Sequence, residues 1–272
     1  MNNFTKRTIS GIAFIVIIVG ALMAGPLTFY ILFAVITGLC LIETYNLSDA
    51  TGAKAQKITG IIAGIVIFTL NFLLAGDFIE TIWLLIILPF PFLVLTRELY
   101  LKESNPFRNI AFTLAGWIYP VLFLSMACWI AYLDVPGSGY NHQMVLGLFV
   151  LVWTNDTFAY ITGRKLGRHK LFSRISPKKT REGSAGGFLF TILAAMIIFF
   201  LFKHLSLLNW IVLAMIVSVA GTFGDLFESA IKRSAGTKES GNLIPGHGGA
   251  LDRFDSAIFV FPLAYAFLKL AA

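Results

Sequence analysis

Nine apolar segments, each long enough to cross a lipid bilayer, follow one another along this 272-residue chain. A transmembrane helix needs about 20 mostly apolar residues. The runs are continuous and do not alternate, so a transmembrane β-barrel is excluded. We predict an all-α, polytopic integral membrane protein with about nine transmembrane helices, at roughly 8–24, 26–45, 57–75, 78–96, 110–133, 143–163, 186–202, 208–227 and 250–270.

Composition supports this class and disfavours others. Hydrophobic residues make up 57% of the chain and charged residues only 13%, whereas soluble domains carry about 25% charged residues. Disorder is excluded because it requires low hydrophobicity. Pro89 and Pro91 predict a kink in the fourth helix. Cys40 and Cys128 lie inside apolar runs, so we expect buried side chains there and no thiol-metal or redox site.

The distribution of Lys and Arg predicts the orientation, because these residues favour cytoplasmic loops. With a cytoplasmic N-terminus, every Lys and Arg except Lys203 and Lys269 falls on the cytoplasmic side. Segment 164–181 holds the whole excess behind the net charge of +7. We predict one membrane domain, in which residues 1–145 form about five spans and residues 146–272 form the remaining spans with the cytoplasmic catalytic loops.

Carboxylates gather toward the cytoplasmic ends of the later spans. Asp156 lies in the sixth predicted span, Asp225 and Glu228 end the eighth, and Asp252 and Asp255 open the ninth. Residues three apart share one face of a helix. Oxygen ligands without a His or Cys set favour Mg²⁺ or Mn²⁺. From spacing alone, helix capping with ion pairs is an equally good explanation.

Two cytoplasmic segments carry the other candidate groups. Residues 174–187 combine basic side chains, hydroxyls and glycines before a helix expected to begin near Gly186, a pattern suited to phosphate binding. The alternative is a basic loop that touches anionic lipids. Residues 238–255 place His247 on a glycine-rich loop, a setting in which histidine is often functional.

Ordered motifs in residues 150–256 resemble the phosphatidate cytidylyltransferases, also called CDP-diacylglycerol synthases. One block runs from Ser229 through Lys232-Arg233 and Pro245-Gly246-His247-Gly248-Gly249 to Asp252-Arg253-Phe254-Asp255. A second resembles the same family at 155–160, 163–168, 176–187 and 224–229. Two positions depart from the family pattern, Glu239 in place of Asp and Ala250 in place of a bulky apolar residue.

The resemblance implies a multi-pass enzyme of the bacterial inner membrane with its active site facing the cytoplasm. Such an enzyme joins CTP to phosphatidic acid and releases pyrophosphate, with Mg²⁺ as cofactor. It also implies a homodimer among membrane lipids, and no nucleic-acid partner.

The resemblance also implies roles for individual residues. We expect Mg²⁺ to be held by Asp225 and Asp252, with Glu228 and Asp255 as further ligands. The expected catalytic residues are Asp225, Lys232, Arg233, Lys238, His247, Asp252, Arg253 and Asp255. The expected substrate-binding residues are Asp156, Arg164, Lys178, Lys179, Thr180, Glu182 and Ser184.

Two other functions remain open from the residues. A CTP-dependent lipid-alcohol kinase shares part of this polar pattern, and would release CDP instead of pyrophosphate. A secondary transporter would place polar residues near the bilayer midplane, often in repeated halves. The crowding of polar groups at the cytoplasmic ends and the lack of a visible repeat disfavour the transporter.

Overall fold

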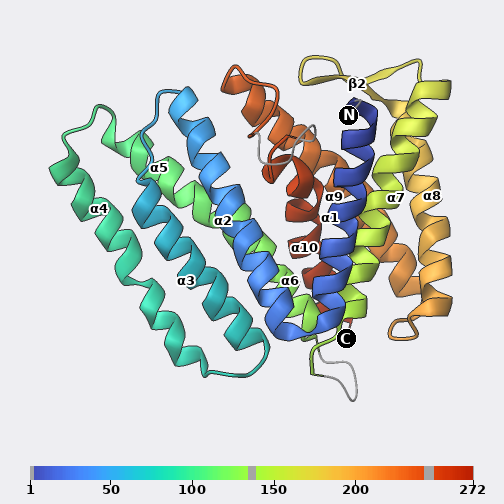
Figure 1. The fold of residues 1–272 in the computed structure, drawn as a ribbon, viewed down its shortest axis with the longest axis horizontal. Helices are drawn as coiled ribbons and strands as arrows, with labels where there is room; N and C mark the ends of the chain where they lie inside the picture. Colours follow the sequence, from blue (N-terminus) through green and yellow to red (C-terminus); the bar gives the residue numbers. More distant parts are fainter. Residues whose placement is uncertain (1–2, 134–138, 242–247, 272) are drawn as a thin grey trace. The chain divides into compact units, whose positions relative to one another are not determined.

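Helices dominate the computed structural model, which describes residues 3–133, 139–241 and 248–271, with side chains from residue 9 onward (Figure 1). The elements are α1 (Asn3–Ala24), α2 (Pro26–Ala50), α3 (Lys57–Ala75), η1 (Thr81–Ile87), α4 (Pro89–Leu101), α5 (Pro106–Gly116), η2 (Trp117–Leu122), α6 (Phe123–Ala131), α7 (His142–Leu166), β1 (Lys170–Phe172), β2 (Ser176–Thr180), α8 (Arg181–Leu201), α9 (Leu207–Ser234) and α10 (Leu251–Ala271).

The helices confirm a polytopic membrane protein. Within the described ranges, eight helical segments are long and apolar enough to span a bilayer. Two of them are composite, because η1 and α4 form Thr81–Leu101 while α5, η2 and α6 form Pro106–Ala131. The first predicted span corresponds to α1, whose apolar stretch Ile9–Ala24 is shorter than the others.

The chain divides into two compact units. Unit 1 comprises Met1–Trp129 and Ile231–Phe254, and unit 2 comprises Ile130–Ala230 and Asp255–Ala272. Helices α9 and α10 therefore contribute residues to both units.

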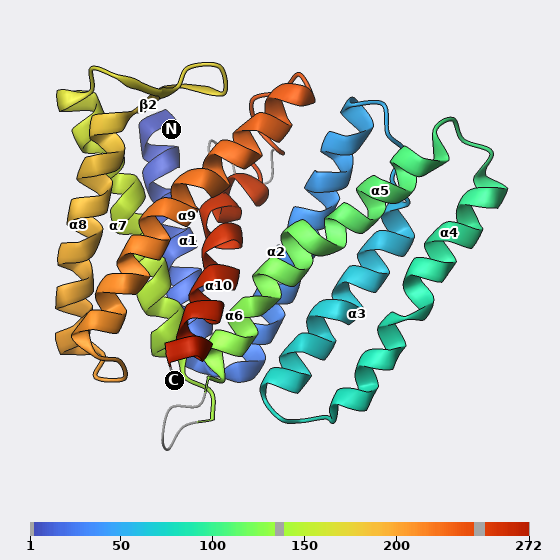
Figure 2. The same ribbon diagram turned by 180° about the vertical axis from the view of Figure 1, so that it is seen from behind.

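Unit 1 is built on the neighbouring helices α2, α3, α4 and α5 (Figure 2). Aromatic side chains fill the space between α2 and α3, where the rings of Tyr30 and Phe72 have centroids 4.8 Å apart. Two polar side chains of this unit donate hydrogen bonds to backbone carbonyls, which keeps their polar atoms paired in an apolar setting. The Tyr45 hydroxyl donates to the Thr113 carbonyl at 2.9 Å, and the Trp117 indole donates to the Gly60 carbonyl at 2.9 Å.

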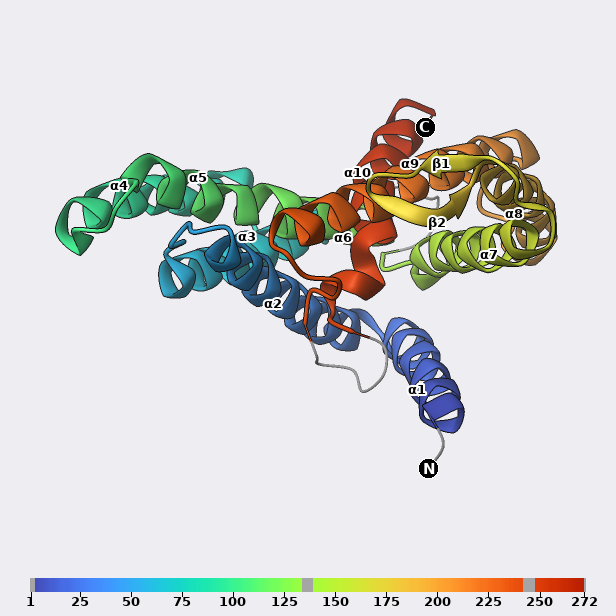
Figure 3. The ribbon, with the colours of Figure 1, turned by 90° about the horizontal axis from the view of Figure 1, so that it is seen from above.

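Unit 2 is built on the close pair α7 and α8 (Figure 3). Small residues allow this approach, as is common between membrane helices. A side chain at Gly187 of α8 would collide with Asn155 of α7. On the same pair of helices, Phe158 and Phe190 stack with ring centroids 3.9 Å apart.

The structure corrects several predicted boundaries. Helix α8 begins at Arg181 and not near Gly186, because Thr180 caps it by accepting a hydrogen bond from the Gly183 amide at 3.1 Å. Helix α9 continues to Ser234, seven residues past the predicted span end, so the predicted cytoplasmic segment after it begins later. Hydropathy marks only the apolar part of such a helix, and the polar turn beyond it is invisible to that signal.

Two local features complete the comparison. The predicted fourth helix is not one regular α-helix, since Thr81–Ile87 forms a 3₁₀ helix and α4 starts at Pro89. The basic segment contains an antiparallel hairpin that the sequence analysis did not predict. In it, Lys170 is paired with Thr180 and Phe172 with Ser176.

Candidate functional site

The first group of predicted residues lies in unit 2 and centres on Asp225 of α9. The Lys179 ammonium of β2 contacts the Asp225 carboxylate at 2.6 Å. The Ser229 hydroxyl, one turn further along α9, donates to the other Asp225 oxygen at 3.2 Å. Strand β2 therefore brings a cation of the basic hairpin directly to a predicted metal ligand.

Further carboxylates surround this ion pair. Asp255 of α10 lies within electrostatic range of Asp225, Glu228 and Asp156. The two helices approach closely here, because a side chain at Gly224 of α9 would collide with the Asp255 backbone. The Asp225 cluster is defined as Asp156, Lys179, Asp225, Glu228 and Asp255.

The two lysines of the hairpin face different surroundings. Successive side chains of a strand point to opposite faces, so Lys178 points away from the side on which Lys179 meets Asp225. Lys178 is exposed, whereas Lys179 is half-buried. The predicted phosphate-binding lysines thus divide into one that contacts a carboxylate and one that is open to solvent.

The other predicted residues at the start of α8 make local contacts. Ser184 donates to the Thr180 carbonyl at 3.3 Å, within the first turn. The Glu182 carboxylate accepts from the amides of Arg168 and His169 at 3.0 and 3.2 Å, and lies 2.6 Å from His169 Nδ1. Glu182 therefore ties the end of α7 to the base of the hairpin. Arg164 is exposed near the end of α7.

The second group lies in unit 1 and centres on Asp252. One Asp252 oxygen contacts the Lys232 ammonium. The other accepts from the Ser240 amide at 3.0 Å, the Ser240 hydroxyl at 3.0 Å and the Gly249 amide at 2.9 Å. Both charged side chains are largely buried, 11% exposed for Lys232 and 9% for Asp252, so each is the counter-charge that the other needs.

A buried carboxylate joins this group from far away in the sequence. Glu43 of α2 accepts from the amides of Ala250 and Leu251 and shares the single Ser240 hydroxyl proton with Asp252. Glu43 is not among the site residues predicted from the sequence. Its signal in the sequence was weak, because Glu43 is a single carboxylate directly after the uncharged run 26–42, and no local spacing pointed to partners about 200 residues later. The Asp252 cluster is defined as Glu43, Lys232, Ser240, Gly249 and Asp252.

The remaining predicted residues of this segment are Arg233, Lys238, His247 and Arg253. Arg233 donates to the Thr237 carbonyl at 2.9 Å and so closes the turn after α9. Lys238 and Arg253 are exposed. His247 lies outside the residues that the structure describes.

The donor chemistry of the Asp225 cluster fits a hard divalent cation, because its carboxylates are the oxygen ligands that Mg²⁺ prefers. Among the described residues, however, no three His, Cys, Asp or Glu side chains converge on one point where they could hold a metal ion. Asp252 already contacts four protein groups. It could bind a metal ion only by giving up its contact with Lys232.

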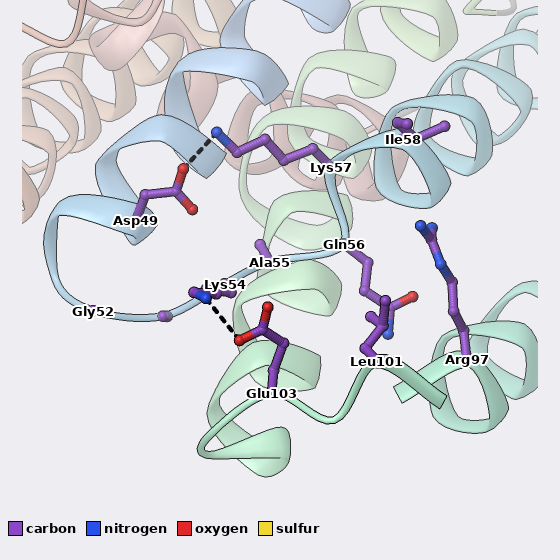
Figure 4. A pocket seen from close by; sticks show the side chains of 11 residues that line it. Asp49, Gly52, Lys54, Ala55, Gln56, Lys57, Ile58, Arg97, Leu101 and Glu103 are labelled. Atoms are coloured by element: carbon purple, nitrogen blue, oxygen red, sulfur yellow. Dashed lines mark hydrogen bonds and ion pairs between the residues drawn. The ribbon is translucent and has the colours of Figure 1, made fainter. Parts of the chain in front are cut away.

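A pocket of about 670 Å³ lies elsewhere in unit 1, at the end of α2 and the start of α3 (Figure 4). It contains none of the predicted site residues. Lys57 contacts Asp49 at 2.5 Å and Lys54 contacts Glu103 at 2.7 Å, so both lysines already face a carboxylate. These ion pairs disfavour the pocket as a polyanion site.

Comparison with known proteins gives matches along nearly the whole chain. A model described as the cytidylyltransferase family matches residues 5–271. A phosphatidate cytidylyltransferase of Staphylococcus epidermidis is 35% identical over 259 residues, covering 94% of this chain and 96% of the relative. Proteins of the same name from Staphylococcus haemolyticus and Staphylococcus aureus are 35% and 34% identical, with the same coverage.

Proposed function

This chain belongs to the cytidylyltransferase family, and we propose that it transfers the cytidylyl group of CTP to phosphatidic acid. The observation that carries the proposal is the match with relatives of that name over 94% of the chain. The charged clusters support it, because both substrates are polyanions and the reaction needs paired cations and metal-binding carboxylates.

The reaction is an in-line displacement at phosphorus. An oxygen of the phosphatidate phosphate attacks the α-phosphorus of CTP, a new P–O bond forms, and the bond from the α-phosphorus to the bridging oxygen breaks. CDP-diacylglycerol and pyrophosphate result. The lipid phosphate is already ionised, so no protein nucleophile is needed. The residues of the chain must instead position two anions and stabilise the charge that develops between them.

We propose that the Asp225 cluster holds the cofactor. Asp225 and Asp255, with Glu228 and Asp156 nearby, are the residues that would bind Mg²⁺. When bound, Mg²⁺ supplies charge neutralisation between nucleotide phosphates. Lys179 is then in place to exchange the Asp225 carboxylate for a phosphate. The exposed Lys178 would contact the nucleotide from the solvent side of the hairpin.

We propose that Lys232 of the Asp252 cluster binds a substrate phosphate. Asp252 keeps this ammonium in one orientation until a substrate phosphate takes the place of the Asp252 carboxylate. Helix α9 carries Asp225, Glu228 and Lys232 at positions i, i+3 and i+7, which lie on one face of a helix. Helix α9 therefore carries residues of both clusters. Arg233, Lys238, His247 and Arg253 remain predicted contributors.

The setting of the enzyme completes the proposal. The multi-pass fold brings the site to its lipid substrate, and the bias of Lys and Arg supports a cytoplasmic N-terminus and active site in a bacterial inner membrane. We also propose that the enzyme is a homodimer, as the family resemblance implies.

The test is an assay of purified protein with phosphatidic acid and CTP across a range of Mg²⁺ concentrations. We expect CDP-diacylglycerol formation that requires Mg²⁺ and falls by about 100-fold or more in Asp225→Asn, the size typical of losing a key electrostatic contact. Near-normal turnover of Asp225→Asn at limiting Mg²⁺ would remove it from the ligand set.

A further inference from the structure

We infer that Glu43 is a positioning residue for the segment that carries Asp252 and Lys232. Its carboxylate fixes the backbone around Ser240 and the first turn of α10, and through them the Asp252–Lys232 pair. The inference rests on the proposed function, which gives Lys232 its role in phosphate binding.

The contacts of Glu43 are numerous for one side chain. One carboxylate oxygen accepts from the Ala250 amide at 2.8 Å. The other accepts from the Leu251 amide at 2.8 Å and from the Ser240 hydroxyl at 2.7 Å. Glu43 is only 7% exposed, so these hydrogen bonds are shielded from water. Hydrogen bonds to a buried charged group are among the stronger ones in proteins.

The position of the carboxylate also suits a helix start. Helix α10 begins at Leu251, and the first amides of a helix have no partner inside it. A negative charge at this end is further favoured by the helix dipole. Glu43 therefore acts as a cap that is supplied by another helix, α2.

Glu43 and Asp252 share the same short segment. Asp252 accepts from the amides of Ser240 and Gly249, while Glu43 accepts from the Ser240 hydroxyl and from the two amides that follow Gly249. A shift of this segment would move the donors that orient Asp252. Since Asp252 in turn contacts Lys232, the chain of contacts runs from Glu43 to the ammonium that is proposed to bind phosphate.

Close packing shows how tightly the segment surrounds the carboxylate. A side chain at Gly241 or at Gly249 would collide with Glu43. The backbone on both sides of the carboxylate therefore lies against it, which leaves little room for another arrangement.

The test compares two buried carboxylates of unit 1. In Glu43→Gln the amide nitrogen can no longer accept, so part of the set of hydrogen bonds is lost. The matched control is Glu98→Gln in α4. Glu98 is 5% exposed and accepts from Gln56 and Asn109, and it contacts neither cluster in the described contacts. Both variants remove one buried negative charge from the same unit.

We expect kcat per folded molecule of Glu43→Gln to fall by about 10- to 100-fold, the size that follows from losing one or two such hydrogen bonds. Glu98→Gln should keep a kcat close to that of the wild type. Tryptic cleavage after the exposed Lys238 should become faster in Glu43→Gln and stay unchanged in Glu98→Gln. In the double variant with Ser240→Ala, the two losses of kcat should not add, since the Ser240 hydroxyl lies between the carboxylates of Glu43 and Asp252.

The inference is overturned if Glu43→Gln keeps the wild-type kcat, or if Glu98→Gln loses kcat and gains tryptic cleavage equally. Additive losses in the double variant would overturn the route through Ser240. Asp252→Asn separates the two proposals. If it is inactive while Glu43→Gln is fully active, only the positioning role fails. If Asp252→Asn is itself fully active, the proposed role of this cluster fails, and the inference fails with it.

Discussion

At the scale of single residues, the candidate site consists of charged side chains that are each oriented by a specific partner. Lys179 contacts Asp225, Lys232 contacts Asp252, and Glu43 accepts from two amides at the start of α10. Such pairing keeps buried charges tolerable before substrate arrives. On the proposed roles of Lys179 and Lys232, a substrate phosphate replaces a carboxylate, which would couple binding to a local rearrangement.

The Lys232–Asp252 pair allows stability and activity to be separated. Asp252→Ala should lower the free energy of unfolding by about 3–5 kcal/mol, because it leaves a buried ammonium without its partner. Replacing both residues, as Lys232→Met with Asp252→Leu, should recover the part of that stability that the unpaired ammonium costs and still abolish product formation, while the amides of Ser240 and Gly249 lose their acceptor. Thermal unfolding in detergent and the cytidylyl-transfer assay measure the two effects.

The exposed pair Lys54–Glu103 provides the control for that experiment. Its side chains are 65% and 33% exposed, so Glu103→Gln should change stability by less than about 1 kcal/mol. A double variant that regains activity together with stability would show that Lys232 takes no part in the chemistry.

The neighbouring lysines of the hairpin should differ in their kinetic effects. Lys179→Ala removes the cation beside Asp225 and should lower kcat by about 100-fold. Lys178 lies on the opposite face of β2, so Lys178→Ala should mainly raise the KM for CTP. Steady-state kinetics with varied CTP distinguish the two, and equal effects on both parameters would argue against separate roles.

At the scale of elements, the sequence predicted the apolar part of each helix but not its polar ends. The span Leu251–Ala271 matches its prediction closely, because its boundaries coincide with the change in hydropathy. Helix α8 starts five residues early, since Thr180 caps a polar first turn that hydropathy cannot detect. The hairpin was missed because charge, and not alternating apolar residues, dominates its strands.

Spacing along α9 predicted that Asp225 and Glu228 share a face, and both lie in the Asp225 cluster. Spacing along α10 paired Asp252 with Asp255 in the same way, but the two side chains belong to different clusters. The contact of Glu43 with residues 240–251 could not be predicted, because it depends on how α2 packs in the folded unit. No single-sequence pattern encodes a contact over 200 positions.

The cap of α8 makes a prediction at this scale. Thr180→Ala should destabilise the protein by about 1 kcal/mol, the usual cost of losing an N-cap side chain. It should also raise the KM for CTP, because the cap residue ends strand β2. Ser184→Ala, which removes a weaker hydrogen bond in the same turn, is the control, and it should cost less. Equal losses in both variants would contradict a special role for the cap.

At the scale of the whole molecule, the fold and the family agree with the proposed reaction. A polytopic helical protein holds its charged groups close to a lipid substrate, and the relatives named phosphatidate cytidylyltransferase match nearly the whole chain. The orientation in the membrane is predicted from the charge bias alone, and it has a test of its own.

Single-cysteine labelling tests that orientation. Cys40 and Cys128 are fully buried, so they should react little. A membrane-impermeant maleimide should label Lys203→Cys in intact bacterial cells and Thr237→Cys only after permeabilisation, because these exposed positions are predicted to lie on opposite sides. The reverse pattern would invert the topology.

The most direct test of the central claim follows the phosphorus atoms of CTP. Purified protein is incubated with phosphatidic acid, Mg²⁺ and CTP labelled at either the α- or the γ-phosphate. Cytidylyl transfer predicts that the α-label enters the lipid product while the γ-label leaves as pyrophosphate. If the γ-label enters the lipid instead and CDP is released, the enzyme is a lipid kinase and the proposed reaction is wrong.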